Sequence, residues 1–291
     1  MALVIGSATI ATGMSPIAEA ALYADPIFID GVTFSSKYDV SNTGEIQVEK
    51  YSAANTIEAT QPGSDFTDEA YSNTVLTIPI CNGFQRSVKV PQYYEATMPT
   101  SVLMNKTADV VESVRAAREK AVIAAIASNA KSDSATKTAI TKANIKDIIL
   151  GERSALRKKY ANPDVVLCSV DTYSAVLAAA GTDYTPLFND DVVRSGRVGM
   201  WLGMVFVEAP FLDGASSYKY RTAEGSNTTV SVATVDFFMY DHNALSIIDR
   251  LSMLRVIDSE NFAGSKVQCE IDTGILVTNT DCLSIKKHTA G

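Results

Sequence analysis

Histidine and cysteine carry much of the acid–base, nucleophilic and metal chemistry of proteins, and this chain has few of either. Its 291 residues include two histidines, His242 and His288. A nucleophile–histidine arrangement would have to use His242, because His288 lies three residues from the end and is hard to hold rigidly. The sequence has no G-x-S-x-G elbow and no H-x-x-x-H or H-E-x-x-H spacing. We therefore interpret His242, which follows Asp241 in a polar stretch, as a surface or turn residue.

The cysteines are too far apart in sequence for a C-x-x-C metal or redox pair. They are Cys81, Cys168, Cys269 and Cys282. The first three lie in apolar, strand-like stretches, where a free thiol behaves as a small buried hydrophobic group. We expect free structural thiols in a chain that is made in a reducing cytoplasm.

The other motifs that could bind a ligand fail on spacing or context. Glycines at 196, 199 and 203 have the spacing G-x-x-G-x-x-x-G, which is not the dinucleotide fingerprint, and we interpret them as a bend before a strand. The acidic loop at 189–191 could hold a cation, but such loops are usually only solvated. Three aspartates are too widely spaced for a carboxylate pair: Asp236, Asp241 and Asp249. We predict no catalytic residue, no metal and no cofactor, so the chain is not expected to be an enzyme.

Charge and hydropathy narrow the class of protein further. The chain has 46% apolar residues, enough for a sizeable core, and 25 basic against 33 acidic residues, a net charge of −8. This balance of charges argues against a protein whose main activity is to bind nucleic acid. The basic run Arg157, Lys158 and Lys159 is interpreted as a solvated helix end. The apolar N-terminal stretch has no cation before Lys37, so we do not expect an export signal, and no apolar run is long enough to predict a membrane span.

The elements begin with a strand pair that has little core of its own. Residues 45–51 alternate polar and apolar side chains, a turn-rich tip follows at 60–69, and a β-rich return occupies 74–80. So charged a hairpin predicts an arm that reaches away from the body and contacts a neighbouring copy of the chain. The residues that we expect to make this intersubunit contact are Ile46, Val48, Tyr51, Phe66 and Tyr71.

A long helix over 107–129 is the clearest prediction. Its apolar stripe consists of Val110, Val114, Ala117 and Ala121, widened by Val111, Val122, Ile123 and Ile126. Glu112 and Arg115 are spaced to pair on one face, and Arg118 should tolerate alanine if it is solvated. At about 1.5 Å per residue the helix spans on the order of 33 Å, which suits a spine for other elements.

The other segments predict a mixed fold. A helix at Ser15 and Pro16 opens the first segment, and Asn82-Gly83 predicts a hairpin or a bulge within residues 75–90. We expect helices at 141–160 and from Asp171 to 180, the latter ended by Gly181. The predicted strands are 164–168, 203–207, 230–240, 266–271, 275–277 and 283–285. The fold class is therefore α+β, with two lobes and one long arm.

This order of elements resembles the major capsid proteins of tailed bacteriophages, whose fold is named after the coliphage Hong Kong 97. Short sequence segments also resemble the family. They are PGSDF (62–66), RSVKVP (86–91), WLGMVFV (201–207) and DFFMYD (236–241), the last followed by ALSI (244–247). The resemblance implies an N-terminal arm at 1–40 and an extended β-hairpin loop at 41–75. It further implies a peripheral domain with the spine helix at 76–135, an axial αβ domain at 136–245, and closing strands shared by both domains at 246–291.

The function that the resemblance implies is a structural shell protein. Copies would assemble as hexamers and pentamers into an icosahedral virion head, in the cytoplasm of a bacterial host, around double-stranded DNA bound without sequence specificity. A separate scaffolding protein and a portal are the other implied partners, and no membrane is involved. Two alternatives stay open: an encapsulin-like compartment shell, and a soluble αβ hydrolase that relies on His242.

Overall fold

The structure is a computed structural model that describes residues 4–5, 8–9, 27–36, 45–51, 73–97, 102–130, 132–133, 139–183, 200–212, 217–223, 226–259 and 261–288. The helix expected at Ser15 and Pro16, the tip of the arm and the acidic loop at 189–191 lie outside these residues.

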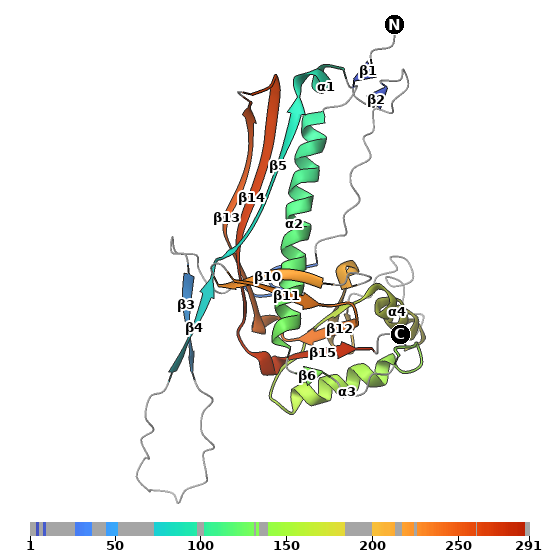
Figure 1. Cartoon of the computed structure of the whole chain (residues 1–291). Helices are drawn as coiled ribbons and strands as arrows, with labels where there is room; N and C mark the ends of the chain where they lie inside the picture. Colours follow the sequence, from blue (N-terminus) through green and yellow to red (C-terminus); the bar gives the residue numbers. More distant parts are fainter. Residues whose placement is uncertain are drawn as a thin grey trace, which may run out of the picture.

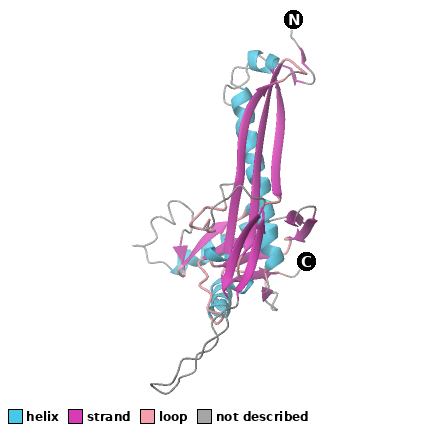
Figure 2. Ribbon diagram, turned by 90° about the vertical axis from the view of Figure 1, so that its left-hand side faces the viewer, coloured by secondary structure: helices cyan, strands magenta, loops and turns pink. Residues whose placement is uncertain are grey.

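A long helix lying on a three-stranded sheet forms the upper part of the molecule (Figures 1 and 2). The helix is α2 (Val102–Asn129), and the antiparallel strands have the order β13 (Leu245–Asp258), β14 (Gly264–Val277) and β5 (Asn82–Pro91). Alternate residues of β5 and β14 turn toward α2, and Val90, Val267 and Cys269 are buried there against Val110 and Val114. The opposite side of β5 carries exposed Gln85, Ser87 and Lys89, as the alternation predicts.

Helix α2 is confirmed, with two differences from the prediction. It begins five residues earlier than 107, since Val102 and Leu103 also pack against the sheet. Ala117 is exposed, and Ala116 is buried in its place. The stripe changes direction there because the helix passes from the sheet into the lower body, where residues 121–126 are all buried. None of the described helices is long and apolar enough to cross a membrane.

Polar side chains also hold α2 in place. The predicted pair forms, with Arg115 Nε donating to Glu112 Oε2 at 2.8 Å. The guanidinium of Arg118 makes two hydrogen bonds to Asp249 of β13, at 3.0 and 2.7 Å, and this side chain is 13% exposed. Arg118 is therefore not solvated, and the condition under which alanine would be mild is not met.

A six-stranded mixed sheet forms the centre of the lower body. Its order is β6 (Ser132–Asp133), β15 (Leu283–Lys287), β12 (Val235–Tyr240), β7 (Val165–Cys168), β9 (Met204–Glu208) and β8 (Met200–Trp201). Every residue of β12 and β7 is buried, because both faces of the sheet are covered. One face packs against the end of α2, and the other against α3 (Ile145–Arg157) and α4 (Val170–Asp183).

The boundaries of these two helices differ from the sequence expectation. Helix α3 begins at Ile145 rather than at 141, and residues 142–144 form a turn before it. It ends at Arg157. Helix α4 runs through Gly181 to Asp183 instead of stopping there.

Several strands were joined, split or missed by the sequence pattern. The segments expected at 266–271 and 275–277 are one strand, β14, and β13 was not predicted. The segment expected at 230–240 divides into β12 and β11 (Ser226–Ser231), which forms a hairpin with β10 (Ser217–Ala223). The smaller elements are β1 (Val4–Ile5), β2 (Ala8–Thr9), α1 (Gln92–Thr97), η1 (Pro210–Leu212), η2 (His242–Ala244) and η3 (Thr280–Cys282).

Residues 27–36, at the end of the expected N-terminal arm, pack into the body. Ile27, Phe28 and Phe34 are buried with residues of α2 and of the six-stranded sheet. The backbone N–H of Ile27 donates to the Glu119 carboxylate of α2 at 3.1 Å, and that of Ser35 donates to a β13 carbonyl at 3.0 Å. This segment therefore ties α2 to the sheet beside it.

Candidate functional site

A projecting hairpin is the first candidate for a functional surface. Strands β3 (Glu45–Tyr51) and β4 (Asn73–Pro79) pair over seven residues, and among the described strands they pair only with each other. The pair stands out from the body (Figure 1). A two-stranded hairpin in water is marginally stable, so this one needs a further surface to pack on.

The five residues expected to make the intersubunit contact are only partly placed. In the register of the hairpin, Ile46 lies opposite Ile78, Val48 opposite Leu76 and Tyr51 opposite Asn73. Phe66 and Tyr71 lie outside the described residues. The base of the hairpin is anchored, because Ile78 and Ile80 of the return segment are buried beside Gly274.

The Asn82-Gly83 pair stands at the start of β5, not in a hairpin turn. The chain leaves β4 at Pro79, passes through Ile80 and Cys81, and enters β5 at Asn82. Asn82 fixes this change of sheet, because its Oδ1 accepts the Arg221 N–H at 2.8 Å and its Nδ2 donates to the Arg221 carbonyl at 3.1 Å. The segment expected as one bent strand is therefore two strands in different sheets.

An apolar strip on β13 is a second candidate surface, and the sequence analysis missed it. Leu254 is paired with Cys269 and Val256 with Val267, so both lie on the side of the sheet that faces α2. Their partners are buried under the helix, whereas Leu254 and Val256 are 51% and 47% exposed. Strand β13 is at the edge of this sheet, beyond the cover of α2. An exposed edge with apolar residues is a ready surface for another chain.

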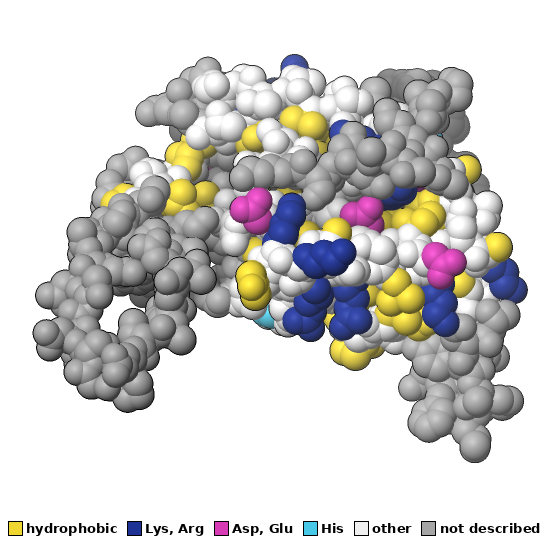
Figure 3. Space-filling view, turned by 90° about the horizontal axis from the view of Figure 1, so that it is seen from below, with side chains coloured by type: hydrophobic (Ala, Val, Ile, Leu, Met, Phe, Trp, Pro, Cys, Tyr) yellow, Lys and Arg dark blue, Asp and Glu magenta, His cyan; other side chains and the backbone are white. Residues whose placement is uncertain are grey.

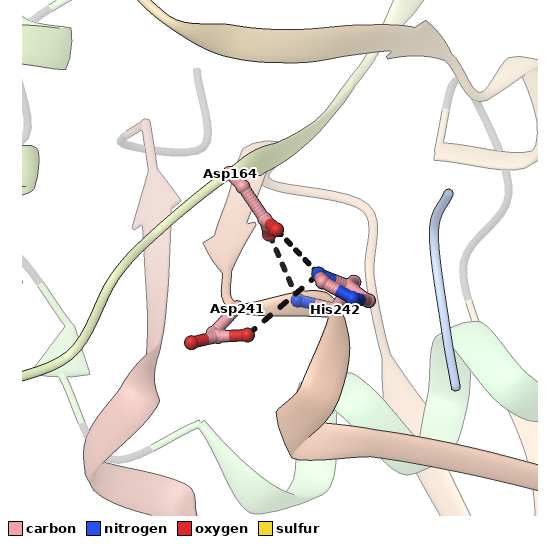
Figure 4. Close-up of side chains that lie close together, drawn as sticks. All are labelled: Asp164, Asp241 and His242. Atoms are coloured by element: carbon pink, nitrogen blue, oxygen red, sulfur yellow. Dashed lines mark hydrogen bonds and ion pairs between the residues drawn. The ribbon is translucent and has the colours of Figure 1, made fainter. Parts of the chain in front are cut away.

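Chemistry-bearing side chains meet at one place, where Asp164, Asp241 and His242 come together (Figure 4). Their nearest ligand atoms lie within 4.8 Å of one another, the spacing of a possible cation site. These side chains already make hydrogen bonds within the protein, however. Asp164 accepts the His242 backbone N–H at 2.8 Å on one oxygen and bonds the His242 ring Nδ1 with the other. Asp241 Oδ1 accepts the N–H of Asn243 at 2.9 Å and so caps η2.

This cluster fastens two chain segments together. Asp164 precedes β7, and His242 opens the turn that follows β12. The interpretation of His242 as a turn residue is confirmed, although its side chain is 29% exposed and so not fully at the surface. The arrangement is one that orients a turn.

The second histidine is held more firmly than the sequence suggests. His288 Nδ1 lies 2.8 Å from Asp236 Oδ1, and its backbone N–H donates to the Thr234 carbonyl at 2.9 Å. Burial raises the pKa of Asp236, while the hydrogen bond from His288 opposes that rise. Asp236 and Asp241 lie near opposite ends of β12, about 16 Å apart at strand spacing, so the two histidines do not form one site.

The remaining sequence candidates are placed as follows. None of the four cysteines forms a disulfide; Cys168 and Cys269 are buried, whereas Cys81 and Cys282 are half-buried. Burial raises the pKa of the Cys168 thiol, which keeps it protonated and unreactive. Gly203, with φ of 75°, forms the turn between β8 and β9, as expected for a bend before a strand. Asp249 accepts a hydrogen bond from Arg118. It lies on β13 of the three-stranded sheet, whereas Asp236 and Asp241 lie on and next to β12 of the six-stranded sheet.

No family model matches this sequence, and no curated protein matches it. Solved structures do match. A chain in the capsid structure of the cyanophage P-SCSP1u has a TM-score of 0.74 at 14% identity, with 100% of this chain and 98% of that chain covered. A chain of the bacteriophage PhiM1 mature capsid has a TM-score of 0.62 at 15% identity, covering 100% and 93%. A chain of the capsid of a native GTA particle has a TM-score of 0.60 at 12% identity, covering 86% of each.

The chain has the phage major capsid protein fold. The similarity extends over the whole length of this chain in two of these matches. The predicted α+β class and the family resemblance of the fold are therefore confirmed.

Proposed function

We propose that this chain is the major capsid protein that forms the icosahedral head of a tailed phage. The observation that carries the proposal is the full-length similarity to phage capsid chains, combined with a hairpin and a strand edge that no described part of the chain covers. Extended elements of this kind bury their area only between subunits. Many copies of a modest interface then make a stable closed shell.

The proposal extends to finer features that the resemblance to the capsid family implies. The segments 1–40, 41–75, 76–135, 136–245 and 246–291 serve as arm, loop, peripheral domain, axial domain and shared closing strands. Copies of the chain form hexamers and pentamers, with a scaffolding protein and a portal as partners, in the cytoplasm of the bacterial host. The virion then encloses double-stranded DNA. The subunit acts without catalysis, metal or cofactor.

Sizing of the purified protein tests this function. The full chain should give closed particles of megadalton mass, visible by electron microscopy, whereas a soluble hydrolase would elute as a small species. Nuclease-protected DNA in particles from infected cells distinguishes a phage head from an encapsulin-like compartment, which would hold protein cargo. Small, uniformly monomeric protein under all conditions would contradict the proposal.

Removal of the extended loop tests its role. Replacing Thr43 to Tyr71 with a short Gly/Ser linker should leave a folded subunit that no longer closes shells, since the buried anchor at Ile78 and Ile80 is retained. Circular dichroism checks folding, and electron microscopy checks assembly. Normal particles from the deletion would show that this segment is not an intersubunit loop.

The apolar strip on β13 can be tested with a matched control. Leu254→Gln with Val256→Gln should weaken assembly, because these side chains are exposed in the single subunit. Arg255 lies between them and points to the opposite face of the strand. Arg255→Gln should assemble normally.

A further inference from the structure

Helix α3 presents a concentration of positive charge that the proposed shell role does not yet use. Residues 139–160 carry six basic and two acidic side chains, a net charge of +4, so the rest of the chain totals −12 of the overall −8. The basic residues are Lys142, Lys146, Arg153, Arg157, Lys158 and Lys159. Seen from below, Lys and Arg side chains gather on the face of the body where α3 lies (Figures 1 and 3).

The cations at the ends of α3 are not neutralised by any residue that the structure describes. Lys142, Arg157, Lys158 and Lys159 are exposed, and none makes an ion pair with a residue that the structure describes. Glu152, one of the two nearby acids, accepts a hydrogen bond from Ser284 at 2.6 Å. By contrast, three arginines of β5 and α2 form ion pairs: Arg86 with Asp109, Arg115 with Glu112 and Arg118 with Asp249.

A strained tyrosine stands beside these cations. Tyr160 has φ of 62°, the left-handed conformation, at the position that glycine usually fills after a helix. The end of α3 has the matching hydrogen bonds, from Tyr160 N–H to Arg157 O at 3.0 Å and from Ala161 N–H to Leu156 O at 3.2 Å. The Tyr160 side chain is 99% exposed, so no packing in the subunit offsets the strain. Its phenol is left free to donate to an external acceptor.

We propose that this face of α3 lines the inside of the shell and contacts the phosphate backbone of packaged double-stranded DNA. The inference rests on the proposed capsid function. Lysine, arginine and tyrosine are side chains that bind phosphate without reading sequence. A protein partner fits less well, because protein interfaces have apolar centres and are depleted in lysine, whereas here the exposed large apolar groups are Leu150 and Tyr160.

The acidic balance of the whole chain is consistent with this contact. A few phosphate contacts per subunit give weak, salt-sensitive binding, and the repulsion from the remaining −12 charge keeps each contact weak. Repetition over the many subunits of a shell makes the summed interaction substantial. The DNA is held against the wall but stays free to leave.

The test compares two charge-matched triple variants of the full-length protein. The first is Arg157→Gln, Lys158→Gln and Lys159→Gln. The control removes three exposed cations elsewhere, with Lys89→Gln, Lys219→Gln and Arg255→Gln. Binding of unassembled protein to a mixed-sequence DNA duplex is measured by fluorescence anisotropy over a salt series, and shell formation is followed separately by electron microscopy.

The α3 triple variant should bind DNA roughly 10- to 100-fold more weakly at low salt, and its slope of log K against log salt should fall by about 3. The control should keep a slope near that of the unmodified protein, and both variants should still form shells. Tyr160→Gly should raise the thermal unfolding midpoint, because glycine relieves the strain, while it weakens DNA binding severalfold. Such a gain in stability with a loss of binding is not expected of a merely structural residue.

Other outcomes distinguish failure of the proposed DNA contact from failure of the proposed capsid function. Equal losses in both triple variants would overturn the α3 surface as a specific DNA contact, while shells that still form would uphold the capsid function. Failure of only the α3 variant to form shells would assign the patch to a protein contact and overturn the inference. Failure of the unmodified protein to form particles would instead remove the capsid function.

Discussion

At the scale of single residues, a buried glutamate decides how the N-terminal segment joins the spine helix. Glu119 is 1% exposed, and its Oε1 accepts the Ile27 N–H at 3.1 Å. Arg115 Nη1 lies 3.7 Å away and Oε2 has no hydrogen-bond partner among the described residues, so the charge is only partly compensated. Burial accordingly raises the pKa of Glu119 above its usual range.

Replacing Glu119 should separate the hydrogen bond from the charge. Glu119→Ala leaves the Ile27 N–H without an acceptor and should lower the free energy of unfolding by about 1–3 kcal/mol. Glu119→Gln retains an acceptor and removes the buried charge, so its loss should be smaller. Denaturant unfolding measures both; a larger loss for glutamine than for alanine would contradict this role.

The pH dependence gives the same residue a second test. Because the folded pKa of Glu119 is raised, the folded state binds more protons than the unfolded state once the pH exceeds the ordinary glutamate pKa of 4.5. The contribution of this group to stability is therefore fully present below that pH and falls as pH rises through the folded pKa. Glu119→Gln should remove this part of the decline in the free energy of unfolding.

His242 is the residue for which a chemical role and a structural role predict different results. We expect His242→Ala to cost about 0.5–3 kcal/mol of stability, because it removes the bond that joins the turn after β12 to Asp164. Assembly of the unmodified protein should survive a chelator. Stoichiometric metal in elemental analysis, lost on His242→Ala with the fold intact, would contradict the structural role. It would instead support a metal site or a hydrolase that relies on His242.

At the scale of elements, the sequence predicts segments whose environment is uniform along their length. The first half of helix α2 was found because Val110 and Val114 face one sheet at helical spacing. Strand β13 was missed because its pattern changes midway. A bulge between Asp249 and Leu251 shifts the alternation. The second half of β13 is an edge of the sheet that α2 does not cover, so Leu254 and Val256 are apolar yet exposed.

The candidate site shows the same limit. The apolar residues of the hairpin were chosen by alternation alone. The apolar strip on β13 depends instead on which strands of the sheet α2 covers. Ala117 was misplaced for a related reason, since the buried side of α2 is set by two different neighbours. Tertiary partners that lie far apart in the sequence decide all of these positions.

The buried and exposed faces of α2 give a matched pair of substitutions. Val114 is 2% exposed, whereas Ala117 is exposed on the same helix. Val114→Asp buries an unpaired charge and should unfold the protein or make it insoluble. Ala117→Asp should change the free energy of unfolding by less than about 0.5 kcal/mol. Soluble, fully folded Val114→Asp protein would show that this face of the helix is not buried.

At the scale of the whole molecule, α2 passes through two environments of very different depth. Its first half lies on one face of a three-stranded sheet, over a small core of Val90, Val110, Val114, Val267 and Cys269. Its second half is enclosed by the six-stranded sheet, residues 27–36 and the β10–β11 hairpin. The upper layer therefore has little apolar burial of its own, and contacts between subunits would supply the rest.

Hydrogen exchange should reveal this difference and its change on assembly. In the free subunit, backbone amides of residues 104–114 should exchange faster than those of 119–126, because local opening of the upper layer exposes less apolar surface. In assembled shells, protection of the first set should rise strongly, while the second set, already enclosed within the subunit, changes little and serves as an internal control. Equal protection along α2 in the free subunit would mean that the upper layer is stable alone. An unchanged first set in closed particles would mean that the contacts between subunits lie elsewhere than on the helix and its sheet.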